Sequence, residues 1–461
     1  MSARLEHLLD DLNPAQREAV TAGDGPLLVL AGAGSGKTRV IAYRIAWLLG
    51  PRGLSPRSLL AVTFTNKAAG EMARRVEALL APVGLKPPLL ATFHSVCVRV
   101  LRQHGSHVGL PAHFTIYDED DRLALVKECM KEGELADRTF TPSAAVHRIS
   151  FLKNQMTAVS EALRDARGPW EKKAALVYSR YEKRLRETGA VDFDDLLLLV
   201  VRLLSEHPDV LAYYQRLWRS VLVDEYQDTN RAQYRIIRLL TAEHRNVCVV
   251  GDSDQSIYKW RGADIHNILD FEEDFPGTKV VRLEQNYRST QSILSLAAGV
   301  IAHNVQRKDK TLWTENPAGE PAKLYRAWDE HEEASFVAQA ILELRRQGVP
   351  WDGVAVFYRT NAQSRVLEDA LRRGRIPYVI VGGVRFYERK EIKDTLAYLR
   401  LTVNPADDVA FRRAIGAPPR GIGPGTLGRL DEEAARRGRP LLAVAAEPPA
   451  DLRGKPARTL Q

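Results

Sequence analysis

The stretch LLVLAGAGSGKT at positions 27–38 constrains the fold of this chain more than any other. Its apolar start, residues 27–30, is too short for a helix of its own and predicts a fully buried strand. A glycine-rich loop follows, and from Arg39 to Leu49 the apolar residues recur at helical spacing. Strand, glycine loop and helix in this order are what a phosphate-binding loop requires. The stretch therefore predicts an α/β protein that binds a nucleoside triphosphate.

The residues at the end of this loop carry the expected phosphate chemistry. Backbone N–H groups at the start of a helix suit an anionic phosphate. Lys37 is expected to neutralise the β- and γ-phosphates, and the Thr38 hydroxyl to ligate Mg²⁺. Ala31 replaces the first glycine of the usual pattern, and a flexible glycine turn before a helix is the alternative. The residues expected to contact the nucleotide are Ala31, Gly32, Ala33, Gly34, Ser35, Gly36, Lys37 and Thr38.

Composition narrows the class of protein. At 461 residues the chain is long enough for roughly two to four domains. Its net charge of +8 favours a polyanionic partner, although evenly spread Lys and Arg would give the same total. The cysteines Cys97, Cys129 and Cys248 lack the spacing of metal ligands. Because the N-terminus lacks the apolar core of a signal peptide and no apolar run approaches a membrane span, we expect a cytoplasmic protein.

The pattern of strand, polar loop and helix recurs along the chain. It is repeated at 58–76 and at 89–105, which predicts a parallel sheet with working loops at the carboxyl ends of its strands. Asn13 and Pro14 predict a helix start, so Gln16 is expected early in a helix just before the phosphate loop.

Between 111 and 190 charged helical stretches replace the strands, which predicts a helical insertion. Its cationic side chains are candidates for a nucleic-acid-facing surface, with solvated helix faces as the equal alternative. They are Lys153, Lys172, Lys173, Arg180, Lys183 and Arg184. Strand patterns return at 219–230, 246–262 and 278–283. Further strand candidates at 322–328, 352–360 and 375–383, with a helix at 333–346, predict a second α/β core, and a helical region from 388.

Two loops carry candidates for hydrolysis. Asp224 and Glu225 follow an apolar strand, so Asp224 is expected to hold Mg²⁺ and Glu225 to position and deprotonate the attacking water. Gln255 lies in the loop after another strand pattern and is expected to hydrogen-bond the γ-phosphate or the attacking water. Arg288 is a candidate arginine finger and Tyr287 a candidate stack on the base, although this pair could equally be structural.

Aromatic and polar residues at several strand ends suggest a second ligand. Tyr258, Trp260 and Arg261 mix aromatic rings with a cation, which suits unpaired bases and phosphate, while core packing is the alternative. His94 is expected either to hydrogen-bond near a DNA backbone or to be structural. The remaining candidates at strand ends are Phe64, Thr65, Asn66 and Thr92.

Taken in order, these motifs closely resemble the superfamily 1 DNA helicases of the UvrD/PcrA/Rep type. The resemblance runs from Leu12 to about Gly425. The matching stretches are LNPAQREAV, AGAGSGKT, TFTNKAAGEM, ATFHS, DFDDLL (192–197), VDEYQDTN, GDSDQSIYKWRGA, LEQNYRST, YRTNAQSRVLE, RIPYVIVGGVRFYERKEIKD and PRGIG.

The resemblance implies roles for individual residues. It assigns Gln16 to the adenine, Arg39 to the vicinity of the nucleotide, and Tyr287 to stacking on the base. Gln255 and Arg288 become γ-phosphate contacts, with ATP and Mg²⁺ as cofactors. The residues that match single-strand base contacts are Phe64, Phe193, Tyr258 and Trp260.

The resemblance also implies a P-loop NTPase fold with RecA-like parallel sheets and helical insertion subdomains. The expected division is 1–110 and 191–283 for the first motor core, 111–190 for its insertion, 284–387 for an incomplete second core, and 388–461 for an incomplete second insertion. It implies ATP-driven 3′ to 5′ movement on single-stranded DNA and at junctions, with roles in excision and mismatch repair. Repair accessory proteins are possible partners, and we expect a monomer or weak dimer.

Two downstream motifs of the family, resembling H-x-x-K-G-L-E-F and T-R-A, do not occur in this sequence. We therefore expect the N-terminal part of a helicase, with impaired hydrolysis unless the remainder is supplied. The alternatives are an ATP-gated DNA-binding module that does not unwind, and the motor part of a recombination helicase-nuclease.

Overall fold

The computed structural model describes residues 6–135, 139–381, 389–449 and 452. The chain divides into two compact units, one formed by Met1–Gly319 with Tyr398–Gln461 and the other by Glu320–Ala397. Within the described residues, no helix is long and apolar enough to cross a membrane.

The first unit is built on a six-stranded sheet in the order β3-β2-β6-β7-β1-β8, in which every neighbouring pair is parallel. The strands are β1 (Leu27–Ala31), β2 (Leu59–Thr63), β3 (Leu89–Thr92), β6 (Ser220–Val223), β7 (Val247–Gly251) and β8 (Lys279–Leu283). Because the strands are parallel, the loops that follow them meet at one edge of the sheet. The predicted α/β fold with a parallel sheet is confirmed.

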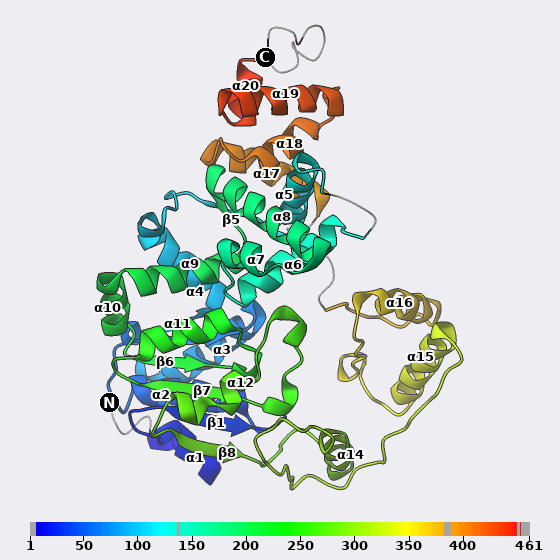
Figure 1. Cartoon of the computed structure of the whole chain (residues 1–461). Helices are drawn as coiled ribbons and strands as arrows, with labels where there is room; N and C mark the ends of the chain where they lie inside the picture. Colours follow the sequence, from blue (N-terminus) through cyan, green and yellow to red (C-terminus); the bar gives the residue numbers. More distant parts are fainter. Residues whose placement is uncertain (1–5, 136–138, 382–388, 450–451, 453–461) are drawn as a thin grey trace. The chain divides into compact units, whose positions relative to one another are not determined.

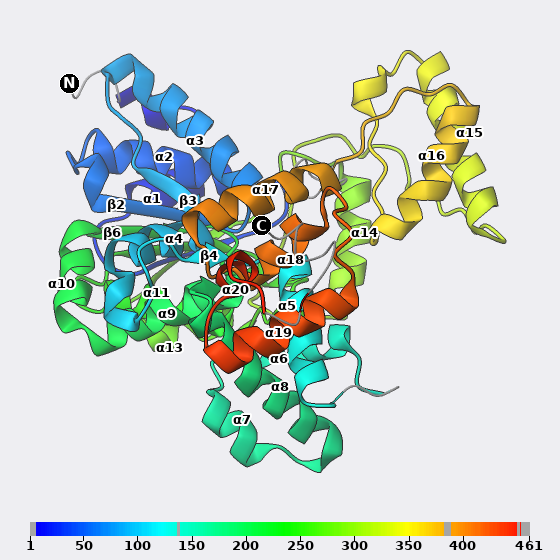
Figure 2. The same ribbon diagram turned by 90° about the horizontal axis from the view of Figure 1, so that it is seen from above.

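Both faces of the sheet are buried, because side chains alternate between two separate apolar cores. In β1, Leu28 and Leu30 belong to one core, whereas Leu27 and Val29 belong to the other. Figure 2 shows the helices on either side of the sheet. The first core contains α4 (Phe93–His104), α9 (Phe193–Glu206), α10 (Pro208–Leu217), α11 (Arg231–Thr241), α12 (His266–Leu269) and α13 (Phe271–Asp274). The second contains α1 (Pro14–Thr21), α2 (Lys37–Leu49) and α3 (Asn66–Leu80).

Helices occupy the segment between β3 and β6, where the sequence predicted a helical insertion. It consists of α5 (Glu119–Glu132), α6 (Pro142–Asn154), α7 (Val159–Asp165) and α8 (Gly168–Glu187). The strands β4 (Thr115–Ile116) and β5 (Ala190–Val191) pair in parallel and join the beginning of the insertion to its end. The insertion has its own apolar core, which includes Tyr117 and Tyr181.

Three C-terminal helices of the first unit follow α17 (Lys390–Val403), and they are α18 (Asp408–Gly416), α19 (Pro424–Arg437) and α20 (Leu441–Ala446). Of these, α18 packs against α5 of the insertion, as Figure 1 shows, and α20 packs against α18 and α19. The buried Tyr117 hydroxyl donates to Asp407 at 2.9 Å, and Arg412 lies 2.6 Å from Glu128. Polar contacts therefore join segments almost three hundred residues apart in sequence.

The strands predicted at 322–328, 352–360 and 375–383 are not present among the described residues. That unit contains α15 (Glu330–Arg346), where a helix was predicted, and α16 (Ser364–Arg373), with a 3₁₀ turn at Trp351–Gly353. Residues 382 and 383 lie outside the described part. A strand forms only when its backbone groups pair with a neighbour, and these apolar segments have no neighbouring strand in the described unit.

Candidate nucleotide and nucleic-acid site

The predicted phosphate loop connects β1 to α2. Gly34 and Gly36 have φ angles of +69° and +92°, which residues with a Cβ atom rarely adopt. Gly36 caps α2, so Lys37 and Thr38 occupy its first turn, where backbone N–H groups have no partner within the helix. The Ser35 hydroxyl donates to the Gly32 carbonyl at 2.7 Å and stabilises the turn. This geometry leaves the helix start suited to an anion.

Gln16 lies early in α1, where the sequence predicted it, and its side chain contacts the phosphate loop. Its side-chain amide donates to the Ser35 carbonyl at 3.0 Å, and its position is fixed by a capping box with Asn13. Asn13 also donates to the Tyr287 hydroxyl at 2.7 Å. Arg39 donates to the Asp11 carbonyl at 2.9 Å and lies over the Tyr43 ring.

The residues after β8 contact the same loop from the other side. Asn286 donates to the Ala33 carbonyl at 2.6 Å, and the Tyr287 N–H donates to the Gly34 carbonyl at 3.0 Å. A Cβ atom on Gly34 would lie only 2.8 Å from the Cβ atom of Arg288. The structure therefore brings Tyr287 and Arg288, both exposed, to the phosphate loop.

Three of the predicted catalytic residues meet at one ammonium group. Lys37 Nζ lies 3.1 Å from Glu225 Oε2 and donates to Gln255 Oε1 at 3.0 Å. Glu225 follows β6 and Gln255 follows β7, so the parallel sheet is what brings these loops together. The Glu225 carboxylate and the Gln255 amide therefore both lie within contact distance of the Lys37 ammonium group.

Asp224 lies beside this group at the end of β6. Burial, together with the neighbouring charge of Glu225, raises the pKa of Asp224 to about 7. Its carboxylate accepts from the Glu225 N–H at 3.0 Å. Glu225 has a φ of +50°, which is strained for a residue with a side chain and is typical of functional loops.

A network that the sequence did not reveal supports Gln255 and Glu225. Asp252 accepts from the Gln255 side-chain amide at 2.6 Å, and its own N–H donates to Gln227 at 2.9 Å. Gln227 in turn donates to Glu225 at 2.8 Å. Lys310, almost fully buried, pairs with the Asp252 and Asp254 carboxylates.

Aromatic residues lie at neighbouring strand ends. Phe64, after β2, stacks on Tyr258 with ring centroids 5.2 Å apart, and Trp260 lies 6.4 Å from Tyr258. Trp260 is 66% exposed, so core packing, the alternative interpretation, does not apply to it. We name the group Phe64, Phe193, Tyr258 and Trp260 the aromatic surface; Phe193 and Trp260 are exposed, whereas Phe64 and Tyr258 are half-buried. The side chain of Arg261 lies outside the described part of the structure.

The other candidates for DNA contact lie at the starts of α3 and α4. His94 packs edge-on against Phe193 with centroids 5.7 Å apart, and burial lowers the pKa of His94. Thr65 and Thr92 cap α3 and α4 with their hydroxyls, which gives both a structural role. Asn66, the first residue of α3, is exposed.

One cation of the proposed insertion surface is placed differently. Lys153 is 1% exposed and pairs with Asp192, Asp195 and Glu182, so its assignment to a nucleic-acid-facing surface is wrong. Its apolar stem and three nearby carboxylates make the interior the more favourable position. Arg184 is partly buried near Glu128 and Glu132, whereas Lys172 and Lys183 are exposed.

Two family models cover most of the chain. The UvrD/REP helicase N-terminal domain matches residues 12–276, and the UvrD-like helicase C-terminal domain matches residues 281–447. The chain belongs to the UvrD/REP helicase family. The first match includes the phosphate loop, the Asp224–Glu225 pair and Gln255. Tyr287 and Arg288 fall within the second.

Individual members of the UvrD/REP family are similar along nearly the whole chain. The protein named ATP-dependent DNA helicase PcrA in Bacillus subtilis is 48% identical over 432 residues, which cover 94% of this chain and 58% of that protein. PcrA of Staphylococcus epidermidis is 46% identical over 442 residues, covering 95% and 60%. PcrA of Staphylococcus aureus is 47% identical over 429 residues, covering 93% and 58%. The chain thus spans about three fifths of the length of these curated relatives.

Sequence reasoning missed several residues of this UvrD/REP site. Gln227 and Asp252 lie inside stretches that were recognised, and their polar side chains after buried strands were a usable signal. Lys310 and Asn286 had none, because a lone lysine or asparagine in a loop predicts no particular partner.

Proposed function

We propose that this chain forms the motor part of an ATP-dependent DNA helicase, which couples ATP hydrolysis to movement on single-stranded DNA. One observation carries the proposal: Lys37 contacts both Glu225 and Gln255 at the sheet edge that also bears exposed Trp260. A hydrolytic centre and a base-stacking surface at one edge are what a DNA-stimulated ATPase needs. The names of the relatives support the same activity.

The residues at this edge fit a magnesium nucleotide. A positive-φ glycine loop exposes backbone N–H groups at the start of α2, and Lys37 supplies a cation that contacts Glu225 and Gln255 through exchangeable polar interactions. The Thr38 hydroxyl and the Asp224 carboxylate are the hard oxygen ligands that Mg²⁺ prefers. Bound Mg²⁺ would neutralise phosphate charge. Gln16 and Tyr287 would hold the adenine.

Glu225 is the proposed general base for the attacking water. Its carboxylate is held by Lys37 and Gln227, so its position is fixed before any ligand binds. Gln255 presents Oε1 to Lys37 because Nε2 donates to Asp252. In this orientation Gln255 can accept a hydrogen bond from the attacking water. Arg288, beside Gly34, would stabilise the charge that develops on the γ-phosphate.

The aromatic surface is the proposed single-strand site. Aromatic faces stack on any base, which suits a motor that moves along DNA of any sequence. His94, Thr65, Asn66 and Thr92 stay candidates for backbone contacts. The division into two motor cores, each with a helical insertion, stays a proposal, as do 3′ to 5′ polarity and a role in excision and mismatch repair.

A second candidate, ATP-gated DNA binding without unwinding, is favoured by one observation. The strand-like segments of Glu320–Ala397 are unpaired among the described residues, which favours a chain that works with the first motor core alone. Unwinding requires two cores that move against each other, whereas gated binding requires only the first.

ATP hydrolysis by this chain, with and without single-stranded DNA, tests the proposal. The measurement is repeated with the remaining C-terminal part of the Bacillus subtilis PcrA added as a separate chain. We expect single-stranded DNA to raise the rate, most strongly with the added part. Hydrolysis that DNA leaves unchanged in both settings would contradict the proposal. Strand displacement on 3′-tailed and 5′-tailed duplexes then separates unwinding from gated binding and gives the polarity.

A further inference from the structure

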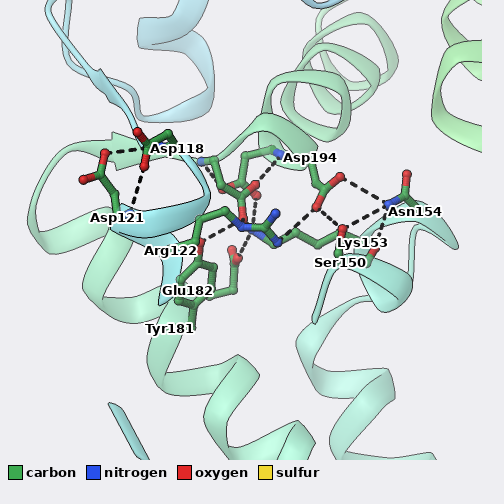
Figure 3. A network of polar contacts seen from close by, with 11 residues as sticks. Asp118, Asp121, Arg122, Ser150, Lys153, Asn154, Tyr181, Glu182 and Asp194 are labelled. Carbon is green, nitrogen blue, oxygen red and sulfur yellow. Dashed lines mark hydrogen bonds and ion pairs between the residues drawn. The ribbon is translucent and has the colours of Figure 1, made fainter. Parts of the chain in front are cut away.

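Asn154, the last residue of α6, is buried where the helical insertion meets the loop after β6. Its Nδ2 donates to Asp194 Oδ1 at 3.2 Å and to the Ser150 carbonyl at 2.8 Å, as Figure 3 shows. Its Oδ1 accepts from the side-chain amide of Asn230 at 2.8 Å. The amide uses its donor and its acceptor on different segments, which fixes its orientation.

An ion cluster next to Asn154 ties α6 to α9 (Figure 3). Lys153 Nζ lies 2.6 Å from Glu182, 3.0 Å from Asp192 and 2.6 Å from Asp195. Burial disfavours the charged amine, but the surrounding carboxylates outweigh that cost and raise the pKa of Lys153. Because separating buried paired charges is costly, the end of α6 and the start of α9 are expected to move together.

Two segments that Asn154 touches hold proposed functional residues. Asp194 directly follows Phe193 at the start of α9, so this contact reaches one part of the aromatic surface. Asn230 caps α11 and lies in the same loop as Glu225, the proposed general base. A single side chain thus bridges the two proposed sites.

The loop that carries Trp260 approaches the same side chain. A Cβ atom on Gly262, whose φ is +83°, would lie 2.9 Å from the Asn154 Cβ atom, so only a glycine allows this approach. The next residue, Ala263, forms an isolated antiparallel bridge with Asn230. Both parts of the aromatic surface therefore meet the loop after β6 at Asn154.

We propose that Asn154 is a positioning residue that couples single-stranded DNA on the aromatic surface to the nucleotide site. The inference rests on the proposed function, because it connects the two sites assigned there. A shift of α9 or of the Gly262 loop changes the contacts of Asn154. Through its hydrogen bond to Asn230, a displacement of Asn154 also displaces the loop of Glu225. This follows because the interior is closely packed and a hydrogen bond tolerates only small changes in distance and angle.

Equilibrium binding measures this coupling without requiring turnover. The affinity of the chain for labelled oligo(dT) is determined with and without a non-hydrolysable ATP analogue and Mg²⁺. The affinity for the analogue is determined with and without DNA. The coupling ratio is the affinity for one ligand in the presence of the other divided by the affinity in its absence. It must be the same for DNA and for the analogue, because coupling between sites is reciprocal. We expect a wild-type ratio of about fivefold or more, within the usual range for coupled sites.

Two variants and one control separate positioning from folding. Asn154→Ala removes the hydrogen bonds to Asp194 and Asn230. Asn154→Asp keeps an oxygen that can accept from Asn230 but places a second carboxylate beside Asp194. Both are expected to reduce the ratio to less than about twofold while each single-ligand affinity changes by less than about twofold. Gln155→Ala, at the same helix end, is expected to keep the wild-type ratio.

Each outcome decides something. A wild-type ratio retained in both variants would overturn the inference. So would a joint loss of both single-ligand affinities with a lowered melting temperature, since that marks a purely structural role. A wild type that binds both ligands without coupling would overturn the inference alone. A wild type that binds neither ligand would contradict the proposed function and the inference with it.

Discussion

Val249 and Val379 both lie in apolar runs that predict strands, yet their surroundings differ completely. Val249 pairs with Val223 and Leu28 in the middle of the six-stranded sheet and is fully buried. Val379, in the Glu320–Ala397 unit, is 88% exposed. An apolar run therefore indicates only that a segment can pair. Whether it becomes a strand depends on neighbours that the run itself does not encode.

The largest expected effect tests this difference directly. Val249→Asp places an unpaired carboxylate in a core and should lower the free energy of unfolding by about 4 kcal/mol or more. Val379→Asp, at an exposed position, should change it by less than about 0.5 kcal/mol. Urea unfolding of both variants provides the measurement. Equal losses would mean that residues 375–381 are packed in solution and that the two regions are alike.

The catalytic assignment concerns the first unit alone. Glu225→Gln removes the proposed base while keeping the size of the side chain and should lower kcat by about 10²- to 10⁴-fold. Affinity for the ATP analogue should change little, because Lys37 and the phosphate loop remain. DNA-stimulated hydrolysis and analogue binding are measured on the same preparation. Full activity in this variant would show that another group activates the water.

Two exposed tryptophans extend the comparison to DNA binding. Trp260→Ala should weaken single-stranded DNA binding by about 1–3 kcal/mol through lost base stacking, with little change in ATP affinity. Trp328, which is 95% exposed in the Glu320–Ala397 unit, is the matched control, and Trp328→Ala should leave DNA affinity unchanged. Fluorescence anisotropy with oligo(dT) measures both. A larger loss in the control would move the DNA site to the other unit.

The smallest effect concerns Lys310. Lys310→Met removes the buried cation that pairs with Asp252, the carboxylate that accepts from the Gln255 side-chain amide. Because Gln255 is then held less firmly, kcat should fall about tenfold, equivalent to about 1.4 kcal/mol. The KM for ATP should stay within about twofold, and Lys310→Arg should restore part of the rate. Steady-state hydrolysis gives both constants. Parallel changes in kcat and KM would indicate a general structural role instead.

The sequence was sufficient wherever a short stretch determined its own environment. The strand before the phosphate loop, the glycines at positive φ and the polar residues after each strand follow from local chemistry, and parallel strands then bring Lys37, Glu225 and Gln255 together. The burial of Lys153 was not predictable in the same way. A lysine on an amphipathic helix has the same local pattern whether water or carboxylates from α8 and α9 surround it.

The strands predicted in Glu320–Ala397 failed for a related reason. Their apolar residues satisfy the local pattern, but sheet formation is decided by pairing between segments distant in sequence. The proposed roles of Asn154 and Lys310 could not be predicted from sequence for the same reason. Each role depends on partners at least forty residues away in the chain, which only the fold brings close.

Binding of a fluorescent ATP analogue in the presence of Mg²⁺ tests the central claim most directly, that the first unit carries a nucleotide site around Lys37. The wild-type chain should bind the analogue, and Lys37→Ala should weaken binding by about ten- to a hundredfold, because hydrogen bonds to charged groups contribute about 1.5–3 kcal/mol. Equal affinities of the two proteins, or no binding by the wild type, would contradict the assignment.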